Sequence, residues 1–157
     1  MQRSCILLFL SALFLGCAKP EEKPAPVVQI INAGPPQYWD MKNFLAEYSL
    51  PRDVDDFYAQ FRETPGCSFG VVRAHKRLSE RSHQEHDLLL YVHTGEAGIT
   101  VEDNNYTIKT GDVVYVPRGL KYSAESSNGK PLDFFAVYYP SFKGEDIIYH
   151  EPPGSAQ

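Results

Sequence analysis

Two histidines stand close together in the middle of the chain, among other polar side chains. His83, Gln84, Glu85 and His86 bring imidazole, amide and carboxylate groups, which can hold a divalent metal ion or orient a polar ligand by hydrogen bonds. In a strand, Gln84, His86 and Leu88 would share one face, and His83 would point outward. The alternative is a polar strand entry without a ligand. No Ser/His/Asp or Cys/His spacing and no phosphate-binding glycine loop occurs in the sequence.

The elements that must position these residues have the pattern of β-strands. Between residues 85 and 125, short apolar runs are separated by glycine-bearing turns at spacings too brief for helices. Gly111-Asp112 predicts a turn, and residues 117–119 predict a sharp corner, because proline presets φ and glycine tolerates positive φ. Residues 132–139 are apolar on both faces, which predicts a buried central strand or a strand paired across a homodimer.

Residues 37–66 have helical spacing instead. A first helix would carry apolar residues at three- and four-residue steps and end at Pro51: Tyr38, Met41, Leu45 and Tyr48. A second helix would be capped by Asp53 and would present a stripe of Val54, Phe57, Tyr58 and Phe61. The charged run from 73 to 81 predicts a solvated connection between strands.

The N-terminus has the features of an export signal. Residues 1–16 carry Arg3 and an apolar run too short to cross a bilayer, which predicts a signal peptide. The sequence L-F-L-G-C resembles the lipobox of bacterial lipoproteins. This implies that Cys17 is lipidated and anchors the protein in the bacterial cell envelope, on the periplasmic or outer-membrane side. Residues 17–36, rich in proline, lysine and glutamate, predict a tether. The alternative is an ordinary signal peptide with Cys17 incidental.

The composition restricts the partners. A chain of 157 residues with 43% hydrophobic residues is suited to one globular domain. Its net charge of −5 argues against nucleic acid as a partner. Beyond Cys17, Cys67 is the one remaining cysteine of the sequence, so no disulfide framework is predicted.

The segment T-G-D-V-V-Y-V-P-R-G-L-K-Y resembles the second motif of the cupin family. Gly111, Pro117 and Gly119 stand at the motif's glycines and proline, and Tyr122 stands at its histidine. Gly95 matches the closing glycine of the first motif. The resemblance implies a mainly β protein, an antiparallel jelly-roll barrel with a short N-terminal helical segment. We therefore expect five regions: signal peptide 1–16, lipidated Cys and tether 17–36, helices 37–66, cupin barrel 67–140 and C-terminal tail 141–157.

The resemblance also implies where a cupin metal would bind. In metal-binding cupins the first motif supplies two histidines and a glutamate, and Leu88 stands at the glutamate position. The two histidine positions fall on one of two pairs, Ser82 and Gln84 or Arg81 and His83. Tyr122 is a poor replacement for the fourth ligand, because a neutral phenol binds metals weakly. We therefore predict no cofactor, with a divalent metal ion as the alternative.

Three functions remain open. The first is a membrane-anchored lipoprotein whose cupin barrel binds a small molecule, or assists a partner, without a metal. Its ligand would contact Gln84, His86 and Tyr122, with His86 and Tyr122 on opposite walls of the barrel. The second is a cupin metalloenzyme, an oxygenase, isomerase or epimerase, with a metal at His83, His86 and Tyr122. The third is a homodimeric scaffold.

Overall fold

The computed structural model describes residues 27–30 and 37–150. The chain divides into two compact units, residues 1–43 and 44–157. The predicted signal peptide, Cys17 and residues 31–36 and 151–157 lie outside the described residues. Among the residues that are described, no helix combines the length and apolar character needed to cross a membrane.

The first unit contains a small antiparallel sheet. Strand β1 (Val27–Ile30) pairs with β2 (Gln37–Asp40), so part of the predicted tether and the start of the predicted first helix are strands. Helix α1 (Met41–Glu47) begins in this unit and ends in the second. It begins there because the Asp40 carboxylate accepts a hydrogen bond from the backbone N–H of Asn43, at 3.1 Å, as an N-terminal cap.

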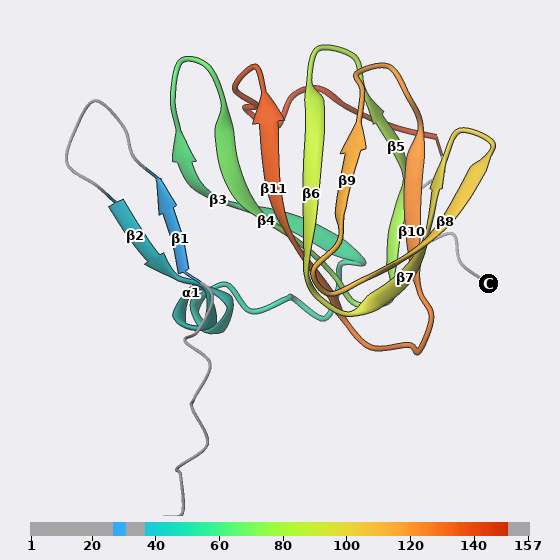
Figure 1. The fold of residues 1–157 in the computed structure, drawn as a ribbon, viewed down its shortest axis with the longest axis horizontal. Coiled ribbons are helices and arrows are strands. Elements are labelled where there is room, and N and C mark those ends of the chain that lie inside the picture. Colours follow the sequence, from blue (N-terminus) through green and yellow to red (C-terminus); the bar gives the residue numbers. More distant parts are fainter. Residues whose placement is uncertain (1–26, 31–36, 151–157) are drawn as a thin grey trace, which may run out of the picture. The chain divides into compact units, whose positions relative to one another are not determined.

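The second unit consists of two five-stranded antiparallel sheets, which confirms the mainly β, jelly-roll prediction. One sheet has the order β3-β4-β11-β6-β9, with bounds Asp56–Glu63, Ser68–Ala74, Leu132–Tyr139, Asp87–Thr94 and Val113–Val116. The other has the order β12-β5-β10-β7-β8, with bounds Ile147–Tyr149, Arg77–His83, Tyr122–Ser126, Glu96–Val101 and Asn104–Lys109. Figure 1 shows β11 between β4 and β6.

The core lies between the two sheets. Strand β11 is central, as its two apolar faces predict, and Phe134 on it is fully buried. On β6 every second side chain faces the core, as predicted: Leu88, Leu90 and Val92 are each at most 1% exposed. The turn and corner glycines Gly111 and Gly119 have φ values of 100° and 83°, in the left-handed region that favours glycine.

The prediction of a second helix is wrong. Residues 56–63 form strand β3, which pairs with β4. Its aromatic residues suit a strand as well as a helix, because a strand with two covered faces also buries residues at irregular spacing. Tyr58 packs edge-on against Tyr138 at 5.2 Å, and Phe61 packs against Phe44 at 4.0 Å between ring centroids. The barrel therefore begins at Asp56, before the predicted boundary at 67.

Two further boundaries differ from the prediction. The charged run from 73 to 81 is mostly strand, because β5 occupies residues 77–83 and β4 continues to Ala74. The C-terminal tail contributes β12, which pairs Ile147 with His83 and Tyr149 with Arg81. A run of charged residues can still form strands when neighbouring strands, distant in the sequence, supply partners for its backbone hydrogen bonds.

Candidate functional site

A bulge in β5 decides which of its side chains face the barrel interior. Opposite β10, Leu78 pairs with Ala124 and Arg81 pairs with Tyr122, so β5 contains one extra residue between these pairs. A bulge changes the alternation of a strand, and both Arg81 and His83 become buried, with 4% and 2% of their surface exposed. The prediction that His83 points outward is therefore wrong.

Arg81 forms a buried ion pair with Asp56 of β3. Its Nη1 donates to Oδ1 of Asp56 at 2.8 Å, and its Nη2 donates to Oδ2. The Nε group donates to the carbonyl of Ser79 at 2.9 Å, and the Tyr149 ring lies 4.9 Å from the guanidinium carbon. Burial alone would lower the pKa of Arg81, but the hydrogen bonds and the charge of Asp56 outweigh it and raise the pKa. This pair places a fixed cation and its counterion inside the barrel.

His83 and Tyr122 share a hydrogen bond in the same region. The distance between His83 Nε2 and the Tyr122 hydroxyl is 3.1 Å. Burial lowers the pKa of His83 to about 4, although the nearby Asp146 charge opposes this, so the ring is neutral at pH 7. Burial also raises the pKa of Tyr122 above its usual range, with a partial opposing effect from Arg81. Tyr122 is thus a neutral phenol.

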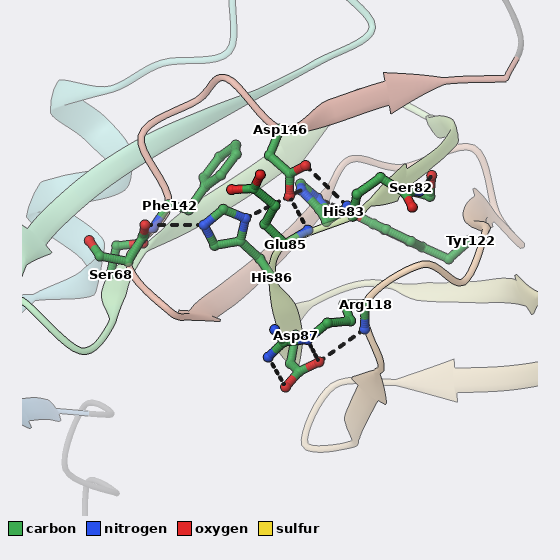
Figure 2. Close-up of polar contacts among 12 residues, drawn as sticks. Ser68, Ser82, His83, Glu85, His86, Asp87, Arg118, Tyr122, Phe142 and Asp146 are labelled. Carbon is green, nitrogen blue, oxygen red and sulfur yellow. Dashed lines mark hydrogen bonds and ion pairs between the residues drawn. The ribbon is translucent and has the colours of Figure 1, made fainter.

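Asp146, from the segment before β12, contacts His86, the residue that precedes β6. Its Oδ2 lies 2.6 Å from His86 Nδ1 and accepts the backbone N–H of Glu85 at 2.9 Å, and its Oδ1 accepts that of Gln84 at 3.1 Å. Burial alone would raise the pKa of Asp146, but these three hydrogen bonds lower it. Figure 2 shows His83 and His86 on either side of this carboxylate. Asp146 was not among the predicted site residues, because it lies 60 residues from His86 and carries no local sequence signal.

The predicted site residues are only partly brought together. His83 lies between Tyr122 and His86, with ring centroids 6.0 Å and 6.4 Å away (Figure 2). Gln84 is exposed, and its side-chain amide donates to the Ser82 hydroxyl at 3.2 Å. The sequence predicted that the Gln84 side chain points into the barrel. This prediction is wrong, because the bulge in β5 and the turn into β6 interrupt the regular alternation of side chains.

Residues 70–138 match the cupin domain family. The protein therefore carries a cupin domain. An uncharacterised protein of Aquifex aeolicus (strain VF5) is 26% identical over 89 residues, which cover 57% of this chain and 73% of that protein. Mannose-1-phosphate guanylyltransferase 2 of Escherichia coli O157:H7 is 28% identical over 81 residues, which cover 52% of this chain but only 17% of that enzyme.

Solved structures agree on the fold of this cupin domain. An uncharacterised conserved protein with a double-stranded β-helix domain from Klebsiella pneumoniae aligns with a TM-score of 0.58. It has 22% sequence identity, and the alignment covers 69% of this chain and 95% of that one. At this identity the likeness concerns the fold alone.

The usual cupin metal does not fit the residues of this cupin domain. Because of the bulge, the pair of β5 residues that points inward is Arg81 and His83. Together with Leu88 and Tyr122 they occupy the four positions at which metal-binding cupins carry their ligands. A guanidinium and an aliphatic side chain cannot ligate a cation, and a neutral phenol does so poorly. Among the four positions there remains one imidazole, and the Arg81–Asp56 ion pair lies beside it.

A separate cleft opens between β8 and β9, the edge strands of the two sheets. The β8–β9 cleft has a volume of about 590 Å³. Tyr106 lies opposite the buried Ile99 in the β7–β8 pairing, yet it is 55% exposed because the sheets part at this edge. The cleft is lined by apolar side chains that include Val114 and Leu120, and by the carboxylates of Glu102 and Asp112. All its lining residues belong to the described range, and none is lysine or arginine.

Proposed function

We propose that the protein is a membrane-anchored lipoprotein whose cupin domain binds a small molecule in the β8–β9 cleft without the usual cupin metal. The observation that carries this proposal is the open cleft between the sheets, whose volume of about 590 Å³ is in the range of small-molecule sites. The ion pair at the family metal position supports the metal-free part of the proposal. Ligand contact by Gln84, His86 and Tyr122 stays a prediction, since these residues do not line the cleft.

The lining of the cleft indicates the chemistry of its ligand. Tyr106 and Tyr115 offer exposed aromatic faces, at 55% and 59% exposure, on which an apolar face of a ligand can stack. Glu102 and Asp112 supply carboxylate acceptors and make the potential negative. The cleft therefore suits a neutral or cationic molecule that carries hydroxyl or amine donors, and it disfavours anions.

Replacing Tyr106 by alanine should weaken ligand binding about tenfold, or about 1.4 kcal/mol, because it removes the stacking face. Binding of methyl hexosides, choline and citrate would be measured by saturation-transfer NMR in buffer with EDTA. We expect signals from at least one neutral or cationic compound and none from citrate. Tyr38→Ala is the control, because Tyr38 is also exposed, at 63%, and does not line the cleft. Equal binding of citrate, or no signal from the other compounds, would contradict the proposal.

Replacing Cys17 by serine should abolish acylation and move the protein from the membrane to the soluble fraction. Each buried methylene of an acyl chain contributes about 0.8 kcal/mol, and more than one chain is needed for stable anchoring. Incorporation of labelled palmitate and fractionation of cells measure the change. Cys67→Ser is the control, because Cys67 belongs to the barrel unit as a free thiol. Label retained by the Cys17→Ser protein would rule out the lipobox assignment.

A homodimer stays a prediction. Two large apolar side chains outside the β8–β9 cleft, on β6 and β11, are exposed, which favours a contact with a second copy: Leu89 (37%) and Tyr139 (59%). Light scattering should give the mass of a dimer, and Leu89→Glu with Tyr139→Glu should give that of a monomer. A monomeric unsubstituted protein would exclude the scaffold function.

A further inference from the structure

Two imidazole rings and one carboxylate meet where β5 passes into β6. One ligand atom from each of His83, His86 and Asp146 lies within 4.8 Å of the other two. The Nδ1 atom of His86 is 2.6 Å, and that of His83 is 4.0 Å, from the same oxygen, Oδ2 of Asp146. Dashed lines in Figure 2 join both rings to this carboxylate.

The second nitrogen of each ring is already held by the protein. Nε2 of His83 shares its hydrogen bond with the Tyr122 hydroxyl, and Nε2 of His86 donates to the carbonyl of Ser141, each at 3.1 Å. Histidines that bind metals generally have their other ring nitrogen fixed in this way, which sets the orientation and tautomer of the ring. Both Nδ1 atoms consequently face the same carboxylate oxygen, Oδ2 of Asp146.

One polar atom at this point is not satisfied by the described part of the protein. Nδ1 of His83 is buried and has no hydrogen-bond partner among the described residues, an arrangement that costs free energy in a folded protein. Since Nε2 of His86 donates to Ser141, Nδ1 of His86 can face the Asp146 carboxylate only with a second proton or with a cation in contact with both. A single cation would satisfy both Nδ1 atoms and the carboxylate.

We propose that His83, His86 and Asp146 form a binding site for a divalent transition-metal ion. Two neutral imidazoles with one carboxylate favour zinc, iron, manganese, cobalt or nickel over magnesium and calcium, which prefer oxygen ligands. The His86–Asp146 contact must widen on binding, because two ligands of one ion are about 3 Å apart or more. Of the four family metal positions this site uses only His83, so it is a different site from that of other cupins and is independent of the β8–β9 cleft.

The site is accessible to solvent. A cavity of about 380 Å³ reaches His86 and Asp146 and is also lined by Glu85, Glu145 and Lys143. Three protein ligands leave coordination positions open, as in metal sites that bind water or a substrate. A metal ion bound there could therefore hold a small ligand from this cavity.

The test is a Co²⁺ titration of the full chain, purified in a mild detergent without a histidine tag and stripped with EDTA. Co²⁺ is chosen because its visible absorption reports nitrogen and carboxylate coordination. We expect one Co²⁺ per chain, displaced by Zn²⁺, with affinity reduced about 100-fold or more in His86→Ala and in Asp146→Asn. Asp146→Asn keeps an acceptor oxygen for the backbone N–H groups, and circular dichroism verifies its fold. His93→Ala is the matched control, because His93 is a half-buried histidine on β6, the strand that begins directly after His86.

Tyr122→Phe distinguishes this site from the set His83, His86 and Tyr122. It should weaken Co²⁺ binding about tenfold, because it removes only the hydrogen bond that orients His83. Binding abolished by Tyr122→Phe but unaffected by Asp146→Asn would overturn the proposal in favour of the tyrosine set. Absence of stoichiometric Co²⁺ in the unsubstituted chain, or equal weakening by His93→Ala, would also overturn it. The titration uses no cleft ligand, so its result is separate from that of the NMR experiment with Tyr106→Ala.

Discussion

Replacing Asp56 by alanine is expected to lower the free energy of unfolding by about 3–5 kcal/mol, because it leaves the Arg81 charge buried without its counterion. The two side chains of the pair are 5% and 7% exposed, so water cannot replace the lost carboxylate. Urea denaturation followed by circular dichroism measures the change. The result would show that the Arg81–Asp56 ion pair is a structural requirement of this barrel.

Two controls separate this effect from a general loss of surface charge. Asp87 pairs with Arg118 in a similar two-bond geometry and also accepts the Arg118 backbone N–H at 3.0 Å, but the side chains are 22% and 46% exposed, so Asp87→Ala should cost much less stability than Asp56→Ala. The double variant Asp56→Leu with Arg81→Met removes both buried charges and should recover much of the lost stability. If Asp56→Ala and Asp87→Ala have equal effects, the buried pair has no special role.

Replacing Gly70 by alanine is expected to cost about 3 kcal/mol, at the upper end of the range for overpacking. A Cβ atom at Gly70 would overlap the carbonyl oxygen of Ala59 and the ring of Tyr58. Ala59 is in the backbone of the neighbouring strand and cannot move without disturbing the β3–β4 pairing. The thermal midpoint and the urea midpoint should both fall.

Gly98 offers a matched control for Gly70. It also lies inside a strand, β7, but a Cβ atom there would meet nothing within 4 Å. Gly98→Ala should therefore leave stability unchanged or raise it slightly, since alanine restricts the unfolded chain more than glycine does. A similar loss in both variants would mean that strand glycines as such, and not the close approach of β3 to β4, control stability.

The prediction of helices at 37–66 was right for a single short helix and wrong beyond it. Helix α1 has a local cause, the cap at Asp40. Residues 56–63 have no comparable local preference, because their aromatic side chains suit either structure. They form β3 because β4 lies beside them and because Phe61 and Tyr58 each find aromatic partners.

The candidate site depended even more on tertiary structure. His83 and His86 were identified from their chemistry and their closeness in the chain. The direction in which the His83 side chain points was not predicted correctly, since one extra residue in β5 reverses it. The carboxylate that joins them, Asp146, comes from 60 residues away. The partner of Arg81, Asp56, lay in a segment predicted as helix.

The sequence by itself determined the cupin barrel and its corners. The turns at Gly111 and Gly119 and the central strand β11 depend on local residue preferences and on apolar patterning, which act within a few residues. Only the tertiary structure decided what lies inside the barrel. Three features depend on contacts between segments that are distant in the sequence: the bulge in β5, the Arg81–Asp56 pair, and the cluster of His83, His86 and Asp146. The free energy of such contacts cannot be predicted from the residues of one segment.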